Sequence, residues 1–147
     1  MIRLLPALAL LLAGCASEGP VRAPDRERPT IVSLNPCTDA ILAEVAAPGQ
    51  LLAISHYSKD PRATSMEPAD VARYRATGGT VEEILALDPD VVVASSFIAP
   101  ATRAALEDLG VEVVTFGATS TVEESLEQVR ALAELAGDTT AGERLAT

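Results

Sequence analysis

The residues of this chain most suited to chemistry are polar and aromatic side chains that follow its predicted strands. Asn35 follows the first strand, Tyr57 the second, and Ser96 and Phe97 the third. Because the carboxyl ends of parallel strands meet at one edge of a sheet, these side chains should lie along a common rim. Aromatic rings beside an amide and a hydroxyl suit a large, partly apolar ligand that a few polar groups orient. We therefore predict that Asn35, Tyr57, Ser96 and Phe97 bind ligand; the alternative is that the two rings cover the end of the core.

The sequence carries no catalytic signature. His56 is the only histidine, and no glycine-rich nucleotide loop, serine elbow or Cys/His zinc spacing is present. We predict no catalytic residue, no cofactor and no metal site, and a small α/β enzyme stays as an alternative that would need a catalytic pair. The formal net charge of −10 gives nucleic-acid binding no electrostatic support.

Four further residues are charged or potentially reactive. Glu82 stands in the first turn of a predicted helix and should project into solvent. A carboxylate at that place interacts favourably with the helix dipole, by up to about 1 kcal/mol, which is its simplest explanation. Cys37 stands at a helix start, where the pKa of a thiol can fall, but we expect a small buried side chain there. Lys59 and Arg62 are expected to be solvated loop charges.

The other elements are arranged around residues 80–97, a short helix followed by a buried strand. Thr80 is a good N-cap, and Glu83 three residues later should complete a capping box. Pro89 ends the helix, because proline cannot continue it. Residues 91–94, Val-Val-Val-Ala, lack polar alternation, which is typical of a strand that is covered on both faces.

Strands and helices alternate through the folded part of the chain. The predicted strands cover residues 30–34, 51–55, 91–94 and 111–116. The predicted helices cover residues 39–46, 80–87, 99–109 and 121–137, with polar loops at 56–67 and 75–79 around one or two helical turns at 68–74. This alternation is typical of βαβ units. It predicts an α/β, Rossmann-like lobe whose parallel sheet of about four strands is flanked by helices.

Two of these helices carry clear end signals. In the helix at residues 99–109, Leu106 and Leu109 should be buried, and the glycine that follows them should end the helix in the left-handed conformation. Thr121 with Glu124 should form a capping box at the start of the next helix.

Residues 138–147 predict the start of one more helix. Thr140 with Glu143 should form a further capping box. The chain ends within two turns of that signal, whereas a helix that begins with a cap usually continues. We therefore expect this segment to be the first part of a longer helix, and the sequence to be a fragment or a truncated product.

The N-terminus has the features of an export signal. Arg3 precedes an apolar run at residues 4–12, which is too short to be a permanent membrane helix. The sequence Leu-Ala-Gly-Cys then matches a bacterial lipoprotein signal, so we predict that residues 1–15 are a signal peptide and that Cys15 is lipidated; an ordinary signal peptide is the alternative. Residues 16–29 are rich in proline and charge, which predicts a disordered tether.

The chain resembles the substrate-binding proteins of ABC importers for cobalamin and ferric siderophores, whose two α/β lobes are joined by one long helix. The matching segments are TIVSLNPCTDAILAEV, LLAISHYSKDP, TVEEILALDPDVVVASS and LEDLGVEVVTF. The most specific of these is the E-x-I-x-A-L-x-P-D-x-V pattern at residues 82–92. The resemblance implies that residues 30–137 form the N-terminal lobe and that residues 138–147 begin the interlobe helix.

The resemblance also implies a role for individual residues. Tyr57 corresponds to a tyrosine that packs on the ligand, and Ser96 and Phe97 fall in the loop that lines the cleft. Glu82 corresponds to the glutamate that docks onto arginines of the permease, and such a charge gives register and association rate more than affinity.

We therefore expect a substrate-binding lipoprotein that captures a metal chelate, cobalamin or a ferric siderophore, and delivers it to ABC permease subunits. It should be periplasmic, held to a membrane by its lipid, and monomeric. The alternatives are an interaction or structural lipoprotein that binds no ligand, and the small α/β enzyme.

Overall fold

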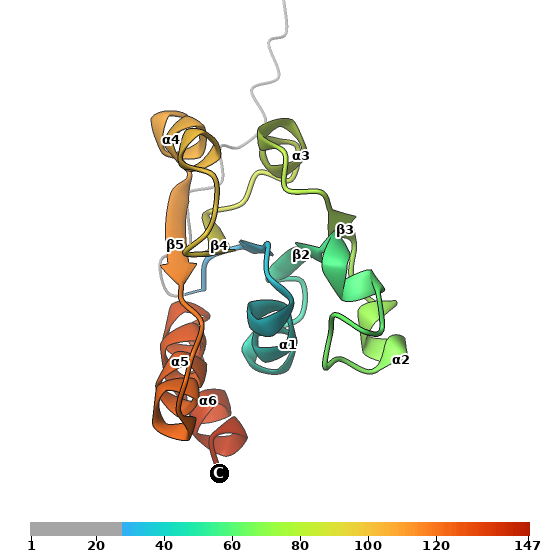
Figure 1. The fold of residues 1–147 in the computed structure, drawn as a ribbon, viewed down its shortest axis with the longest axis vertical. Helices are drawn as coiled ribbons and strands as arrows, with labels where there is room; N and C mark the ends of the chain where they lie inside the picture. The colour runs from blue at the N-terminus through green and yellow to red at the C-terminus, as the bar shows by residue number, and fades with distance from the viewer. Residues whose placement is uncertain (1–27) are drawn as a thin grey trace, which may run out of the picture.

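Five parallel strands form the sheet of the computed structural model, which describes residues 28–147 (Figure 1). The strands are β1 Ile31–Ser33, β2 Leu51–Ser55, β3 Ala76–Thr77, β4 Val91–Ser95 and β5 Glu112–Phe116. They lie in the order β3-β2-β1-β4-β5, and every neighbouring pair is parallel, so the predicted α/β class is confirmed. The predicted signal peptide, Cys15 and most of the tether lie outside the described residues.

The prediction of about four strands missed β3, which falls in the segment predicted to be the loop at residues 75–79. β3 is only two residues long and pairs with β2 through Ile54↔Ala76 and Ser55↔Thr77. Two residues carry no apolar run and no alternation, so nothing local marks them as a strand. Their extended conformation comes from pairing with the edge of β2.

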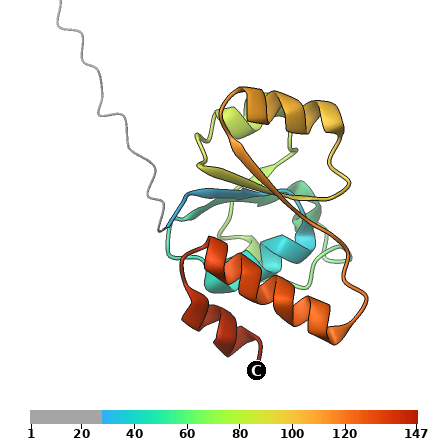
Figure 2. The same cartoon turned by 90° about the vertical axis from the view of Figure 1, so that its left-hand side faces the viewer.

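Helices cover both faces of the sheet. They are α1 Pro36–Val45, α2 Pro68–Val71, α3 Val81–Leu85, α4 Pro100–Asp108, α5 Val122–Leu135 and α6 Thr139–Leu145, with a 3-10 helix, η1, at His56–Lys59. Figures 1 and 2 show α3 and α4 on one face and α1, α5 and α6 on the other. Among residues 28–147, each helix is too short or too polar to cross a bilayer.

The core has two parts because successive strand residues point to opposite faces of the sheet. Ile31, Val91 and Val93 pack against the side of α1 and α5, whereas Val32 and Val92 pack against the side of α3 and α4. The four residues 91–94 are at most 3% exposed, so the predicted strand with two buried faces is confirmed.

The predicted capping box at Thr80 forms only in half. The Thr80 hydroxyl accepts from the Glu83 N–H (3.3 Å), as predicted. The Glu83 carboxylate, however, accepts from the Gly78 N–H (2.7 Å) and the Thr77 hydroxyl (3.0 Å). The turn after β3 offers these donors close by, and the carboxylate therefore ties β3 to α3. The capping box of Thr121 is complete, as predicted.

The last helix begins differently from its prediction. Asp138 caps α6 by accepting from the Ala141 N–H (2.8 Å), so Thr140 lies inside the helix. Glu143 pairs with Arg130 of α5 (2.9 Å) instead of closing a capping box. An aspartate two residues before Thr140 is at least as good an N-cap as a threonine, which explains the shifted start.

The helix before β5 has one buried leucine where two were predicted. Leu106 is fully buried, but Leu109 is 59% exposed. α4 already ends at Asp108, so Leu109 occupies the C-cap and turns outward. Gly110 has a φ of 84°, which confirms the predicted left-handed end of the helix.

Candidate functional site

The carboxyl-terminal edge of the sheet collects the polar and aromatic residues that were predicted to bind ligand. β2, β1 and β4 are neighbours and run in the same direction. Tyr57 follows β2, Asn35 follows β1, and Ser96 and Phe97 follow β4. The topology therefore brings all four positions to one edge. The strands that carry Tyr57 and Phe97 lie two positions apart, roughly 10 Å.

Tyr57 and Phe97 are presented by the same local device. A serine ends each strand, and its hydroxyl accepts from the backbone N–H two residues later: Ser55 from Tyr57 (3.2 Å) and Ser95 from Phe97 (3.1 Å). The chain thus turns sharply at the strand end, and the ring points outward. Tyr57 is 59% exposed and Phe97 is 85% exposed. This exposure argues against the alternative that the two rings cover the end of the core.

Asn35 has a structural function at this edge. Its Oδ1 accepts from the Cys37 N–H (2.9 Å) and caps α1, which therefore begins at Pro36, three residues earlier than predicted. Its main-chain carbonyl accepts from the Thr38 hydroxyl (3.0 Å). Cys37 is exposed, so the prediction of a buried thiol was wrong. The first turn of α1 directs this side chain outward, while Thr38 and Asp39 point into the protein.

A buried polar cluster under the edge was not singled out in the sequence. It comprises Ser33, Thr38, Asp39, Ser55 and Ser58, which are all at most 2% exposed. The Asp39 Oδ2 accepts from the Ser55 N–H (2.9 Å) and from the Ser58 hydroxyl (2.6 Å). Its Oδ1 has no hydrogen-bond partner among residues 28–147. The sequence signal was weak, because an aspartate in the first turn of a helix is ordinarily a solvated favourable charge.

Burial raises the pKa of Asp39 from 3.8 to about 6. The hydrogen bonds from Ser58 and Ser55, together with the nearby Ser33 hydroxyl, favour the ionised form and oppose this effect. Desolvation is the larger of the two influences. Asp39 therefore has a pKa of about 6 at the base of the turn that carries Tyr57.

Lys59 and Arg62 behave differently, although both were predicted to be solvated loop charges. Lys59 is exposed, as predicted, but its ammonium also donates to the main-chain carbonyls of Val71 (2.7 Å) and Tyr74 (2.8 Å), which the sequence did not predict. It ties η1 to the end of α2, a contact that only tertiary folding creates. Arg62 is exposed and pairs with Asp60 (2.8 Å), as expected for a loop charge.

Glu82 projects from the first turn of α3 and is exposed, as predicted. No hydrogen bond or ion pair engages its carboxylate within residues 28–147, whereas that of the adjacent Glu83 is held by the turn after β3. Glu82 borders a shallow hollow of about 280 Å³ that Arg75 and Thr77 also line. Its carboxylate is therefore available to a partner.

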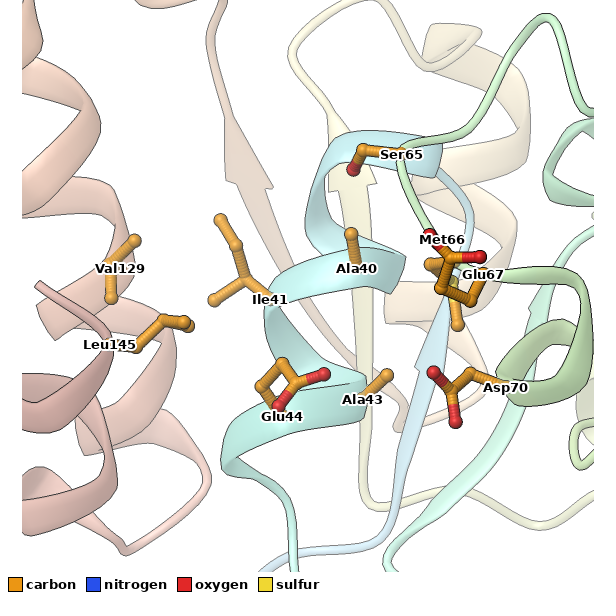
Figure 3. A pocket seen from close by; sticks show the side chains of 10 residues that line it. All are labelled: Ala40, Ile41, Ala43, Glu44, Ser65, Met66, Glu67, Asp70, Val129 and Leu145. Atoms are coloured by element: carbon orange, nitrogen blue, oxygen red, sulfur yellow. The ribbon is translucent and has the colours of Figure 1, made fainter.

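The hollow in Figure 3 is a separate feature of the surface. It lies over α1 and has a volume of about 420 Å³. In the close-up, Ile41 is directed toward Val129 and Leu145, while Glu67 and Asp70 approach α1 from its other side. The hollow shares no lining residue with the four predicted ligand positions. Residues 28–147 also contain no cluster of three or more His, Cys, Asp or Glu side chains suited to a metal ion.

Several solved structures described as periplasmic binding proteins are similar to this chain. They include a periplasmic heme binding protein from Pseudomonas aeruginosa, with 21% identity and a TM-score of 0.63, which aligns with 80% of this chain and 42% of its own. A possible iron-binding (periplasmic solute-binding) protein from Staphylococcus epidermidis has 18% identity and a TM-score of 0.66, over 80% and 45%. The periplasmic vitamin B12 binding protein BtuF of Vibrio cholerae has 24% identity and a TM-score of 0.61, over 80% and 45%.

This chain thus spans less than half the length of these three solved proteins. No curated protein matches it. The family model described as "Periplasmic binding protein" matches residues 31–147, which confirms the resemblance noted in the sequence and the fold class. The chain belongs to the periplasmic binding protein family.

Proposed function

We propose that this chain is the first lobe of the substrate-binding protein of an ABC importer, and that it captures a metal chelate: a heme, cobalamin or a ferric siderophore. The observation that carries the proposal is the pair of exposed rings, Tyr57 and Phe97, on one sheet edge of a member of this family. The function is capture and not catalysis.

The size and chemistry of this edge favour a chelate over a small polar solute. Aromatic rings contribute large contact areas and stack on other flat groups. Tyr57 and Phe97 follow strands that lie roughly 10 Å apart, so a rigid macrocycle or a compact chelate could contact both rings. Ser96, which is exposed, and the Asn35 amide would orient polar groups at the ligand's margin. Two of the similar structures are described as heme and vitamin B12 binding proteins.

Titration of the purified chain tests this proposal. Hemin, cyanocobalamin and ferric desferrioxamine B would each be added, with binding followed by calorimetry. We expect one of them to saturate, and Tyr57→Ala and Phe97→Ala each to weaken binding up to about tenfold, which is about 1.4 kcal/mol of lost ring contact. Leu109→Ala is the matched control, because Leu109 has the same 59% exposure as Tyr57 but lies at the end of α4.

If none of the three substitutions changes the dissociation constant, the ligand binds elsewhere on the chain. Saturation by none of the three probes would instead favour the lipoprotein that binds no ligand. Thermal unfolding gives a second readout, since a ligand at a hundred times its dissociation constant adds about 2.7 kcal/mol of stability.

We infer that Glu82 docks the loaded protein onto a basic surface of the permease. It is exposed and unengaged, and complementary charge fixes register and speeds association. Glu123 offers a matched control, because it occupies the same second helical position behind a capping threonine and a valine. In cells whose chelate uptake depends on this gene, Glu82→Gln should slow uptake and Glu123→Gln should not. Equal uptake in both variants would exclude this role.

For residues 1–29 we propose export, cleavage and lipidation at Cys15, with the tether giving the monomeric lobe reach in the periplasm. Cells grown with labelled palmitate should incorporate the label into the wild-type chain and not into Cys15→Ser. Label retained by the variant would show that a residue other than Cys15 is acylated.

A further inference from the structure

The buried carboxylate of Asp39 accepts hydrogen bonds from the residues on either side of the turn that carries Tyr57. We infer that Asp39 is the positioning residue of this site: it holds η1 in the conformation that presents Tyr57 at the sheet edge. The part of Tyr57 in binding ligand rests on the proposed function. The hold of Asp39 on the turn can be tested without any ligand.

The contacts of Asp39 bracket Tyr57 on both sides. The same oxygen, Oδ2, accepts from the Ser55 N–H (2.9 Å) before Tyr57 and from the Ser58 hydroxyl (2.6 Å) after it. Hydrogen bonds to an ionised acceptor are short and about twice as strong as neutral ones. Asp39 is itself held in place, because its N–H donates to the Asn35 carbonyl (2.8 Å). The end of β1, the start of α1 and the Tyr57 turn therefore form one hydrogen-bonded unit.

The charged groups around this unit have other partners. Lys59 of η1 donates to carbonyls at the end of α2, and His56 faces the Thr77 carbonyl (3.3 Å). On α5, which packs against α1, Arg130 pairs with Glu143 of α6. Asp39 thus meets hydroxyl and N–H donors, and it is the side chain that holds the turn on both sides of Tyr57.

The stability of the fold alone does not explain a buried aspartate at this position. Burying a carboxylate is unfavourable unless its hydrogen bonds are satisfied, and the Asp39 Oδ1 has no partner within residues 28–147. A turn that is already ordered, however, loses less entropy when ligand binds. This pre-organisation gives a physical reason for a polar residue in a position that an apolar side chain could fill.

Tyrosine fluorescence tests the hold on the turn. The chain has two tyrosines and no tryptophan, so a Tyr74→Phe background reports on Tyr57 alone. We expect Asp39→Ala to lower the anisotropy of Tyr57 emission and Asp39→Asn to restore it, because an amide oxygen can still accept both hydrogen bonds. Ser58→Ala, which removes one bond, should lower it less. The reciprocal Tyr57→Phe background reports Tyr74, whose anisotropy should stay constant.

Unchanged Tyr57 anisotropy in Asp39→Ala would overturn the inference, and so would an equal loss at both tyrosines, which would indicate general loosening. If Asp39→Ala does not fold, Ser58→Ala decides by the same criterion. Binding is then measured with the chelate probe that saturates the wild type. If the turn of Asp39→Ala adopts the binding conformation about a tenth of the time, the dissociation constant of this variant should be about tenfold higher. Altered anisotropy without binding of any probe would leave the positioning role intact and reject the proposed function alone.

Discussion

The clearest physical consequence of the buried Asp39 is a dependence of stability on pH. Burial raises the pKa of Asp39 from 3.8 to about 6, so between these values the folded chain holds a proton that the unfolded chain has released. The contribution of Asp39 to the free energy of unfolding is fully present below its pKa in the unfolded chain. It is lost as the pH rises through its pKa in the folded chain. One pKa unit corresponds to 1.36 kcal/mol, so raising the pKa from 3.8 to about 6 makes the loss about 3 kcal/mol at neutral pH.

Asp39→Asn removes this titration and keeps a similar shape. Urea unfolding of the wild type and of Asp39→Asn, followed by circular dichroism between about pH 4 and pH 8, gives the free energy of unfolding of each chain. We expect the variant's stability relative to the wild type to increase with pH by about 2 kcal/mol across this range, because pH 4 is already just above the unfolded pKa and part of the effect lies below it. Comparing two chains cancels the titration of all groups that they share.

Asp60 provides a control of opposite sign. Arg62 lowers the pKa of this exposed carboxyl, so its contribution to stability is present above its unfolded pKa and is lost in acid. Asp60→Asn should therefore lose relative stability as the pH rises, by an amount that solvent screening keeps small. A difference between Asp39→Asn and the wild type that stays flat, or that falls with pH, would refute the conclusion that burial dominates at Asp39.

Two further predictions concern packing and hydrogen bonding far from the site. Gly142→Ala would place a β-carbon 2.5 Å from that of Ala133, so α5 and α6 must separate. We expect the free energy of unfolding in urea to fall by about 1–3 kcal/mol. Gly117→Ala is the control and should change it little, because the added β-carbon meets no atom within 4 Å. Gln50→Ala removes a buried amide that donates to two main-chain carbonyls (2.9 and 3.0 Å) and accepts from one N–H (2.9 Å), so we expect a comparable loss of about 1–3 kcal/mol by the same measurement.

Much of the fold could be predicted because its signals are local. The apolar run of β4, the proline after α3 and the threonine that caps α5 each act through residues a few positions away. Their alternation with helices predicts a parallel sheet, and the direction of its strands brings Asn35, Tyr57, Ser96 and Phe97 to one edge. The residues that can form this edge are therefore recognisable in the sequence.

What the sequence by itself determined was the order of strands and helices, their approximate bounds and the membership of the edge, since these follow from periodicity and turn chemistry. Only the tertiary structure decided which side chains are buried, bonded or exposed: the burial of Asp39, the hydrogen bonds of Lys59 to the end of α2 and the outward turn of Leu109. The pairing of β3 belongs to the same class, because two residues become a strand only beside β2. Such features depend on neighbours that the fold brings from distant parts of the chain, and no local pattern encodes them.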